Sequence, residues 1–185
     1  MIKSILKLAE FCTNKFNNMN TEQKVQYVLD RFDIQDVITK YSFGQDLHQG
    51  TDNRVADVWK DVFTPDAKLE YSAAGSPSPI SYPEMIKIMR GDGTNEGNMT
   101  GPFTNWQHLV GNPVVTIDGD TAKSRVDLWA THKGKVFEGA PAYSLYVAGA
   151  FEDELVRTDK GWRISMRRLI LHFMDMHHTA PMPTA

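Results

Sequence analysis

The sequence predicts an α+β domain in which a curved, mostly antiparallel sheet wraps around one long N-terminal helix. Apolar residues recur every three or four positions in the first half of the chain, and every second position after about residue 105. Residues 118–120 and 159–161 are short Gly-containing segments between alternating runs, as expected of hairpin turns. Helices followed by a meander of strands are typical of an α+β domain.

The first half is expected to be mainly helical. Asn20 can cap a helix over Glu22–Leu47, and a break is expected near Asp33. The apolar face of this helix comprises Val25, Val28, Leu29, Phe32, Ile34, Val37, Ile38 and Tyr41. Further elements are a helix over 53–63 ended by residues 64–67, a strand over 68–72, and a helix over 84–90 with Pro83 in its first turn.

The second half is expected to form four strands, over residues 106–117, 121–132, 141–158 and 162–174. Residues 91–104 precede them and contain four glycines without periodicity, so we expect a mobile loop there. Because this loop lies just before the first strand, it is predicted to border the mouth of a cavity and to become ordered when a ligand binds.

Length and composition indicate one globular domain and exclude several classes of partner. The chain has 185 residues and a net charge of -3, without a basic stripe for nucleic acid or a polybasic run for a membrane surface. Its single cysteine, Cys12, is consistent with a reducing, cytoplasmic compartment. The expected organisation is an N-terminal extension over 1–19, a domain over 20–178 and a flexible tail over 179–185.

Asp46 and His108 are the main candidates for catalysis. Asp46 is predicted at the C-terminal end of the long helix, where a carboxylate is poorly placed against the helix dipole unless it has a specific partner. His108 is predicted near the start of the first long strand. A carboxylate that orients an imidazole produces a base able to move a proton near neutral pH.

The order of elements, together with several short segments, resembles a known family. The segments are residues 34–41, Asp46, Trp59, residues 63–67, His108, residues 115–122, residues 149–153 and residues 159–164. Over residues 22–175 the chain is similar to the nuclear transport factor 2-like superfamily, whose fold is a cystatin-like cone. Within it, the chain resembles the SnoaL-like branch of polyketide cyclases, scytalone dehydratase, bile-acid 7-alpha-dehydratase and hexachlorocyclohexane dehydrochlorinase.

This resemblance implies that Asp46 and His108 transfer protons inside the cone without a metal or another cofactor. It also implies that Tyr41 and an arginine assist with the leaving group or an oxyanion, and either Arg167 or Arg168 could be that arginine. A homodimer or homotrimer is expected. We expect the cavity wall, which would contact a small-molecule substrate, to include Trp59, Trp106, Trp129 and Phe151.

The predicted activity is that of a cofactor-free lyase. Dehydration of an apolar, hydroxylated natural-product intermediate of polyketide or terpenoid type is favoured, and an isomerase or cyclase is the alternative. A non-catalytic binding module is a further alternative. Epoxide hydrolysis on the same fold is another, and Arg125 and Asp127 could supply part of the Asp-Arg-Asp arrangement that it needs, although a surface ion pair is the simpler interpretation of these two. His48 is a weaker site candidate, and His172, His177 and His178 lack the spacing of a metal site.

Overall fold

The structure is a computed structural model that describes residues 16–179 except 51, 53, 137 and 139–141. Most of the expected N-terminal extension, residues 1–15, and most of the expected tail, residues 180–185, lie outside the described residues. The helices are α2 (Thr21–Leu47), α3 (Val55–Trp59), the 3₁₀ helix η1 (Ser72–Ala74) and α4 (Tyr82–Arg90). In the described part of the chain, no helix has the length and apolar character needed to cross a membrane.

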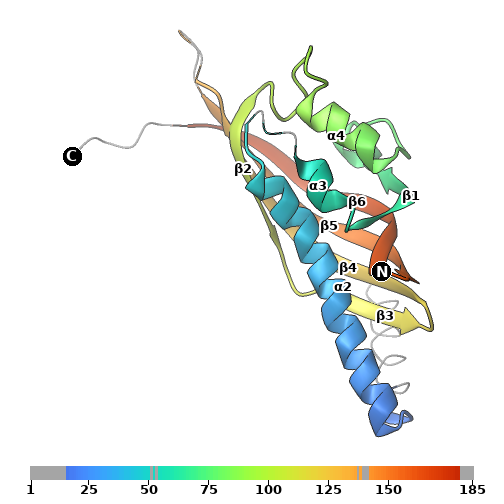
Figure 1. Cartoon of the computed structure of the whole chain (residues 1–185). Coiled ribbons are helices and arrows are strands. Elements are labelled where there is room, and N and C mark those ends of the chain that lie inside the picture. The colour runs from blue at the N-terminus through green and yellow to red at the C-terminus, as the bar shows by residue number, and fades with distance from the viewer. Residues whose placement is uncertain (1–15, 51, 53, 137, 139–141, 180–185) are drawn as a thin grey trace.

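Six strands form one curved sheet that α2 crosses on one face (Figure 1). They are β1 (Phe63–Glu70), β2 (Phe103–Val110), β3 (Val114–Asp118), β4 (Thr121–Gly134), β5 (Tyr143–Thr158) and β6 (Gly161–His178). The sheet order is β1-β6-β5-β4-β2, and β3 also pairs with β4. Every pairing is antiparallel except that of β1 with β6. The predicted α+β fold with a mostly antiparallel sheet is therefore confirmed.

Helix α2 begins at a capping box and continues without a break. Asn20 accepts a hydrogen bond from the backbone N–H of Gln23 at 2.9 Å, and the Gln23 side chain accepts one from the Asn20 N–H at 3.0 Å. The helix runs for 27 residues, so the break expected near Asp33 is absent. The sheet contacts one side of the helix from Asp30 onward, since Asp30 and Ile34 are buried whereas Phe32 is 60% exposed.

Two predicted boundaries that involve prolines differ from the structure. Pro65 was expected to lie in a segment that ends a helix, but it lies inside β1, an edge strand where a missing N–H is tolerated. The strand expected over residues 106–117 is divided at residues 111–113, where Pro113 cannot donate to the ladder. Both β2 and β3 still pair with β4, so the two strands follow one another along the same edge of the sheet.

The glycine-rich segment over 91–104 packs against the end of α4. The backbone N–H of Asn98 donates to the Ile88 carbonyl at 2.8 Å, and that of Met99 donates to the Met89 carbonyl at 3.0 Å. Gly97 is in such close contact with this helix that a Cβ there would lie 2.2 Å from the Met89 carbonyl oxygen. The segment therefore joins α4 to β2 through specific backbone contacts.

Candidate functional site

Asp46 and His108 are brought together at the end of α2. The side chain of His108 lies on the face of β2 that α2 covers, and its Nδ1 is 2.8 Å from Oδ1 of Asp46. The other carboxylate oxygen, Oδ2, accepts the backbone N–H of His108 at 2.7 Å. An ionised carboxylate only accepts hydrogen bonds, so in the neutral imidazole this contact favours the tautomer with the proton on Nδ1 and a lone pair on Nε2. This arrangement fixes the tautomer that a general base requires.

His132 extends this site and was not predicted from the sequence. The His108 and His132 rings are perpendicular, with centroids 5.5 Å apart. His132 is buried, and its Nδ1 has no hydrogen-bond partner among the described residues. Burial, with a contribution from the nearby charge of His108, lowers the pKa of His132 to about 3. A neutral imidazole therefore stands beside the dyad. The alternation of β4, which also turns Ala130 inward, was the sequence signal that could have identified it.

Tyr41 lies deeper beneath α2, within a cluster of rings. Its hydroxyl is 2.7 Å from that of Tyr71, and its ring stacks on Trp59 at 4.6 Å between centroids. Burial raises the pKa of both tyrosines above the ordinary value, so both hydroxyls remain protonated near neutral pH. The pair can share one proton between its two oxygens and direct the other toward an acceptor. Tyr71 was not predicted.

Of the two adjacent arginines, Arg167 points inward and Arg168 points outward, as the alternation of a strand requires. The guanidinium of Arg167 makes a two-point ion pair with Asp153, at 2.7 and 2.8 Å, and lies 4.1 Å from the centre of the Tyr41 ring. Burial acts to lower the pKa of Arg167, but Asp153 outweighs it and raises the pKa above its ordinary value. Nη1 of Arg167 is buried and has no hydrogen-bond partner in the described part of the chain.

Three of the four expected wall residues lie on the inner side of the sheet. Trp59, Trp106 and Phe151 are buried there, and Trp106 donates from Nε1 to the Gln45 carbonyl at 2.8 Å. Trp129 does not join them: it is 40% exposed and lies on the outer face, in contact with other rings. The expectation for Trp129 is thus corrected by strand alternation, since its neighbours along β4 take the inward positions.

His48 lies apart from the dyad, with a carboxylate of its own. Its Nδ1 is 3.0 Å from Oδ2 of Asp52, four residues along the chain. The buried guanidinium of Arg90 binds the carbonyl of His48 and both oxygens of Gln45, and it also lies 4.2 Å from the Trp106 ring centre. Arg90, also not predicted, therefore holds the end of α2 against α4.

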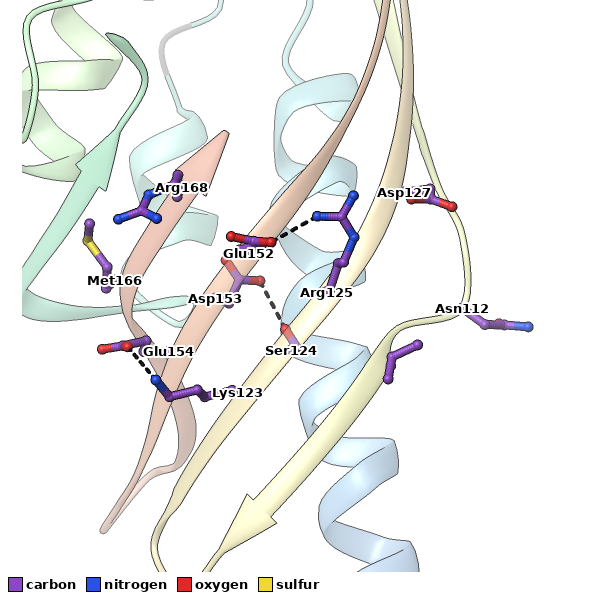
Figure 2. A pocket seen from close by; sticks show the side chains of 11 residues that line it. Asn112, Lys123, Ser124, Arg125, Asp127, Glu152, Asp153, Glu154, Met166 and Arg168 are labelled. Carbon is purple, nitrogen blue, oxygen red and sulfur yellow. Dashed lines mark hydrogen bonds and ion pairs between the residues drawn. The ribbon is translucent and has the colours of Figure 1, made fainter. Parts of the chain in front are cut away.

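A hollow of about 660 Å³ lies on the outer face of the sheet, the face opposite α2 (Figure 2). Its lining includes Arg125, Asp127 and Arg168, and Arg125 pairs with Glu152 at 2.9 Å. In Figure 2 these side chains point away from α2, which lies behind the sheet. Arg125 and Asp127 therefore do not face the inner site as epoxide hydrolysis would require, and Arg125 forms a surface ion pair.

Comparisons with known proteins give the chain a family. The sequence pattern of the SnoaL-like domain matches residues 26–168. Uncharacterized proteins of Mycobacterium bovis and Mycobacterium tuberculosis are 34% identical over 143 residues, which is 77% of this chain and 86% of theirs. Among solved structures, the Kfla4162 protein of Kribbella flavida is 25% identical, with a TM-score of 0.66 over 80% of this chain and 95% of its own.

More distant structures share the fold. A hexachlorocyclohexane dehydrochlorinase, LinA type 2, has a TM-score of 0.65 at 17% identity over 86% of this chain and 99% of its own. A scytalone dehydratase-like protein of Novosphingobium aromaticivorans has a TM-score of 0.61 at 17% identity over 86% and 97%. An NTF2-like protein of the same organism, described as having a cystatin-like fold, has a TM-score of 0.60 at 18% identity over 83% and 88%. The chain belongs to the SnoaL-like domain family, with the cystatin-like fold of the NTF2-like superfamily.

Proposed function

We propose that this protein is a cofactor-free lyase that dehydrates an apolar, hydroxylated small molecule by proton transfer through Asp46 and His108. The observation that carries this proposal is the double contact of the Asp46 carboxylate, one oxygen to the His108 ring and the other to the His108 backbone. This contact orients the ring and stabilises the imidazolium that forms when His108 accepts a proton. Polyketide and terpenoid intermediates are the proposed substrate class.

In the proposed reaction, Nε2 of His108 removes a proton from a carbon next to a carbonyl. The electron pair of the broken C–H bond forms a carbon–carbon double bond, and the hydroxyl group on the neighbouring carbon departs. It leaves as water after it takes the proton back from the imidazolium, so the enzyme returns to its starting state. The Tyr41–Tyr71 hydroxyl pair and the unpaired Nη1 of Arg167 are the proposed donors to the negative charge that develops on the carbonyl oxygen.

Two features of the site support this assignment. The buried His132 is neutral at ordinary pH, so it can exchange a hydrogen bond with a substrate oxygen without adding a charge beside His108. Aromatic walls around Tyr41 keep bulk water away from the charges that form, which strengthens their electrostatic stabilisation. The fold shared with a dehydrochlorinase and a scytalone dehydratase-like protein is consistent with elimination chemistry.

The test is turnover by wild type and variants against a panel of hydroxylated, ring-bearing candidate substrates. We expect His108→Ala to lower turnover by roughly 10²- to 10⁴-fold, the usual contribution of a general base. Asp46→Asn should be similarly severe because an amide cannot stabilise the imidazolium, and Tyr41→Phe should be milder. His172→Ala, at an exposed position on β6, is the matched control, and a metal chelator should have no effect.

Mass spectrometry of the product separates the alternatives. Loss of one water from the substrate indicates dehydration, whereas an unchanged mass with a new structure indicates isomerisation or cyclisation by the same proton transfers. Near-wild-type turnover in folded His108→Ala and Asp46→Asn proteins would contradict catalysis by the dyad.

A non-catalytic binder is the second candidate, favoured by one observation. The rings of Tyr41, Trp59, Phe63 and Phe151 contact one another beneath α2 and form an aromatic surface of the kind that binds apolar small molecules. A binder would retain a small molecule from the same panel in equilibrium dialysis and release it unchanged. His108→Ala would change the affinity for that molecule, and neither protein would convert it.

A further inference from the structure

The edge of β2 is completed by side chains from the end of α2. β2 is the last strand of the sheet, so its outward backbone groups have no neighbouring strand to pair with. The Trp106 N–H donates to Oε1 of Gln49 at 2.9 Å, and Nε2 of Gln49 donates to the Trp106 carbonyl at 2.8 Å. Two residues along β2, the His108 N–H donates to Asp46. Gln49 and Asp46 thus bind this edge as a further strand would.

The same amide also contacts the backbone of Asp46. Nε2 of Gln49 donates to the Asp46 carbonyl at 2.6 Å, so both of its hydrogens and its oxygen are used. One side chain therefore joins the residue that carries the carboxylate to the strand that carries the imidazole. Gln49 accepts from the N–H and donates to the carbonyl of one residue, Trp106, and this two-point contact resists sliding of α2 along β2.

Other contacts at the end of α2 do not duplicate this link. Arg90 binds the carbonyls of Gln45 and His48, which holds the helix to α4 rather than to β2. The indole of Trp106 donates to the Gln45 carbonyl, but this contact is made by the side chain on the inner side of the strand and does not involve the Trp106 backbone. Only the contacts of Gln49 and Asp46, among the hydrogen bonds described here, tie the end of α2 to the outward backbone groups of β2.

We propose that Gln49 is a positioning residue for the Asp46–His108 pair. Its carboxamide sets the separation and register of α2 and β2 at which one Asp46 oxygen meets the His108 backbone and the other meets the ring. This inference rests on the proposed function for its catalytic meaning. A displacement of about 1 Å in a reacting group can cost roughly 10²-fold in rate, so a link of this kind matters more for turnover than for overall stability.

The experiment reads the dyad directly, in the substrate-free full-length protein, by long-range ¹H–¹⁵N NMR of the histidine rings. The signals of His108 are identified by their loss in His108→Ala. Wild type should show His108 protonated on Nδ1, with a proton that exchanges slowly with water. Gln49→Met has a similar length but no amide, and it should mix the two tautomers and speed exchange of that proton at least tenfold.

Gln49→Glu is the second variant, chosen to remain informative if Gln49→Met does not fold. It keeps an acceptor for the Trp106 N–H but places an oxygen where Nε2 had donated to two carbonyls. Like Gln49→Met, it should speed exchange of the His108 Nδ1 proton with water. The matched control is Gln107→Met, on the exposed outer side of β2, which should match wild type. Circular dichroism and thermal unfolding confirm that each variant is folded.

Wild-type-like His108 signals in a folded Gln49 variant would overturn the proposal, as would a wild-type His108 protonated on Nε2. These outcomes do not depend on turnover, so they are distinct from failure of the proposed reaction, which His108→Ala tests. With a substrate in hand, Gln49→Met should lower kcat by roughly 10- to 100-fold and leave KM within about twofold, because the amide of Gln49 is fully used in contacts to Asp46 and Trp106.

Discussion

At the scale of the residue, Asp46 sits where a charge is unfavourable for the helix. The last carbonyls of α2 carry partial negative charge, which repels a carboxylate by typically 0.3–1 kcal/mol. The two hydrogen bonds from His108 offset this cost, because hydrogen bonds to a charged group are stronger than those between neutral groups. Among the described residues the side chain of Asp46 hydrogen-bonds to a partner 62 positions away, so a long-range contact rather than its own helix stabilises it, as the proposed function expects.

His132 gives a pH prediction with a definite sign. Its pKa is lowered from 6.5 to about 3 in the folded protein, so the unfolded chain binds the proton more readily. Stability from this group is therefore complete above about pH 6.5 and is lost as the pH falls toward 3, with a slope of up to about 1.4 kcal/mol per pH unit. His132→Leu should flatten the pH dependence of the free energy of unfolding, measured with urea, between about pH 6 and about pH 4.

The control is His172→Leu, at an exposed position, which should keep the wild-type slope. Since acidic groups titrate in the same range, the difference between variant and wild type is the quantity to compare. Parallel curves for wild type and His132→Leu would show that the ring is not held neutral by burial.

The buried pair of Arg167 and Asp153 gives a prediction for stability. Both side chains are fully buried, so removing one charge leaves the other without compensation. We expect Asp153→Asn to lower the free energy of unfolding by about 3–5 kcal/mol. The double variant Asp153→Leu/Arg167→Met should cost less than the sum of its single substitutions, since it leaves no buried charge. Additive losses in urea unfolding would indicate that the two charges do not depend on each other.

At the scale of the element, Gly44 is a point of close contact between α2 and α3. A Cβ on Gly44 would lie 2.9 Å from Cγ1 of Val58 and 3.1 Å from its Cβ. Alanine favours a helix by about 1 kcal/mol over glycine, but overpacking typically costs 1–3 kcal/mol. Gly44→Ala should therefore be destabilising on balance. Val58→Ala removes Cγ1 but keeps Cβ, so it relieves only the shorter of these two contacts. Gly44→Ala should therefore be less destabilising in the Val58→Ala background than in the wild type when both are measured by thermal unfolding.

Element types were predictable from the sequence, whereas element extents depended on tertiary contacts. The apolar face of α2 was read from spacing alone, yet only Ile34 onward is covered, because the width of the sheet decides how much of the helix is buried. Asp46 and His108 were predictable because a helix-end carboxylate and a strand histidine fit a known family pattern. Gln49, Arg90 and Tyr71 were not, because long-range contacts, which leave no periodic signal, give them their roles.

At the scale of the whole molecule, the two faces of the sheet differ in character. The inner face carries the dyad and the ring cluster beneath α2. The outer face carries paired charges around the hollow, such as Lys123 with Glu154 at 3.0 Å, and beside them an aromatic patch. We define this outer patch as Trp129, Tyr146 and Phe173; Trp129 lies 6.0 Å from each of the other two rings. Exposed aromatic groups bordered by charges are typical of protein interfaces.

We propose that this patch joins copies of the chain into a homodimer or homotrimer. Trp129 and Phe173 are 40% and 45% exposed in the single chain, and a stable interface would bury about 800 Å² on each partner. Sedimentation of the wild type at micromolar concentration should give two or three times the chain mass of 20.9 kDa.

Trp129→Lys should shift the protein to a monomer with an unchanged circular dichroism spectrum, because it places a charge in the patch without altering the core. Phe43→Lys, on an exposed side of α2, should leave the assembly intact. A wild type that sediments only as a monomer, or an oligomer unaffected by Trp129→Lys, would rule out this face as the interface.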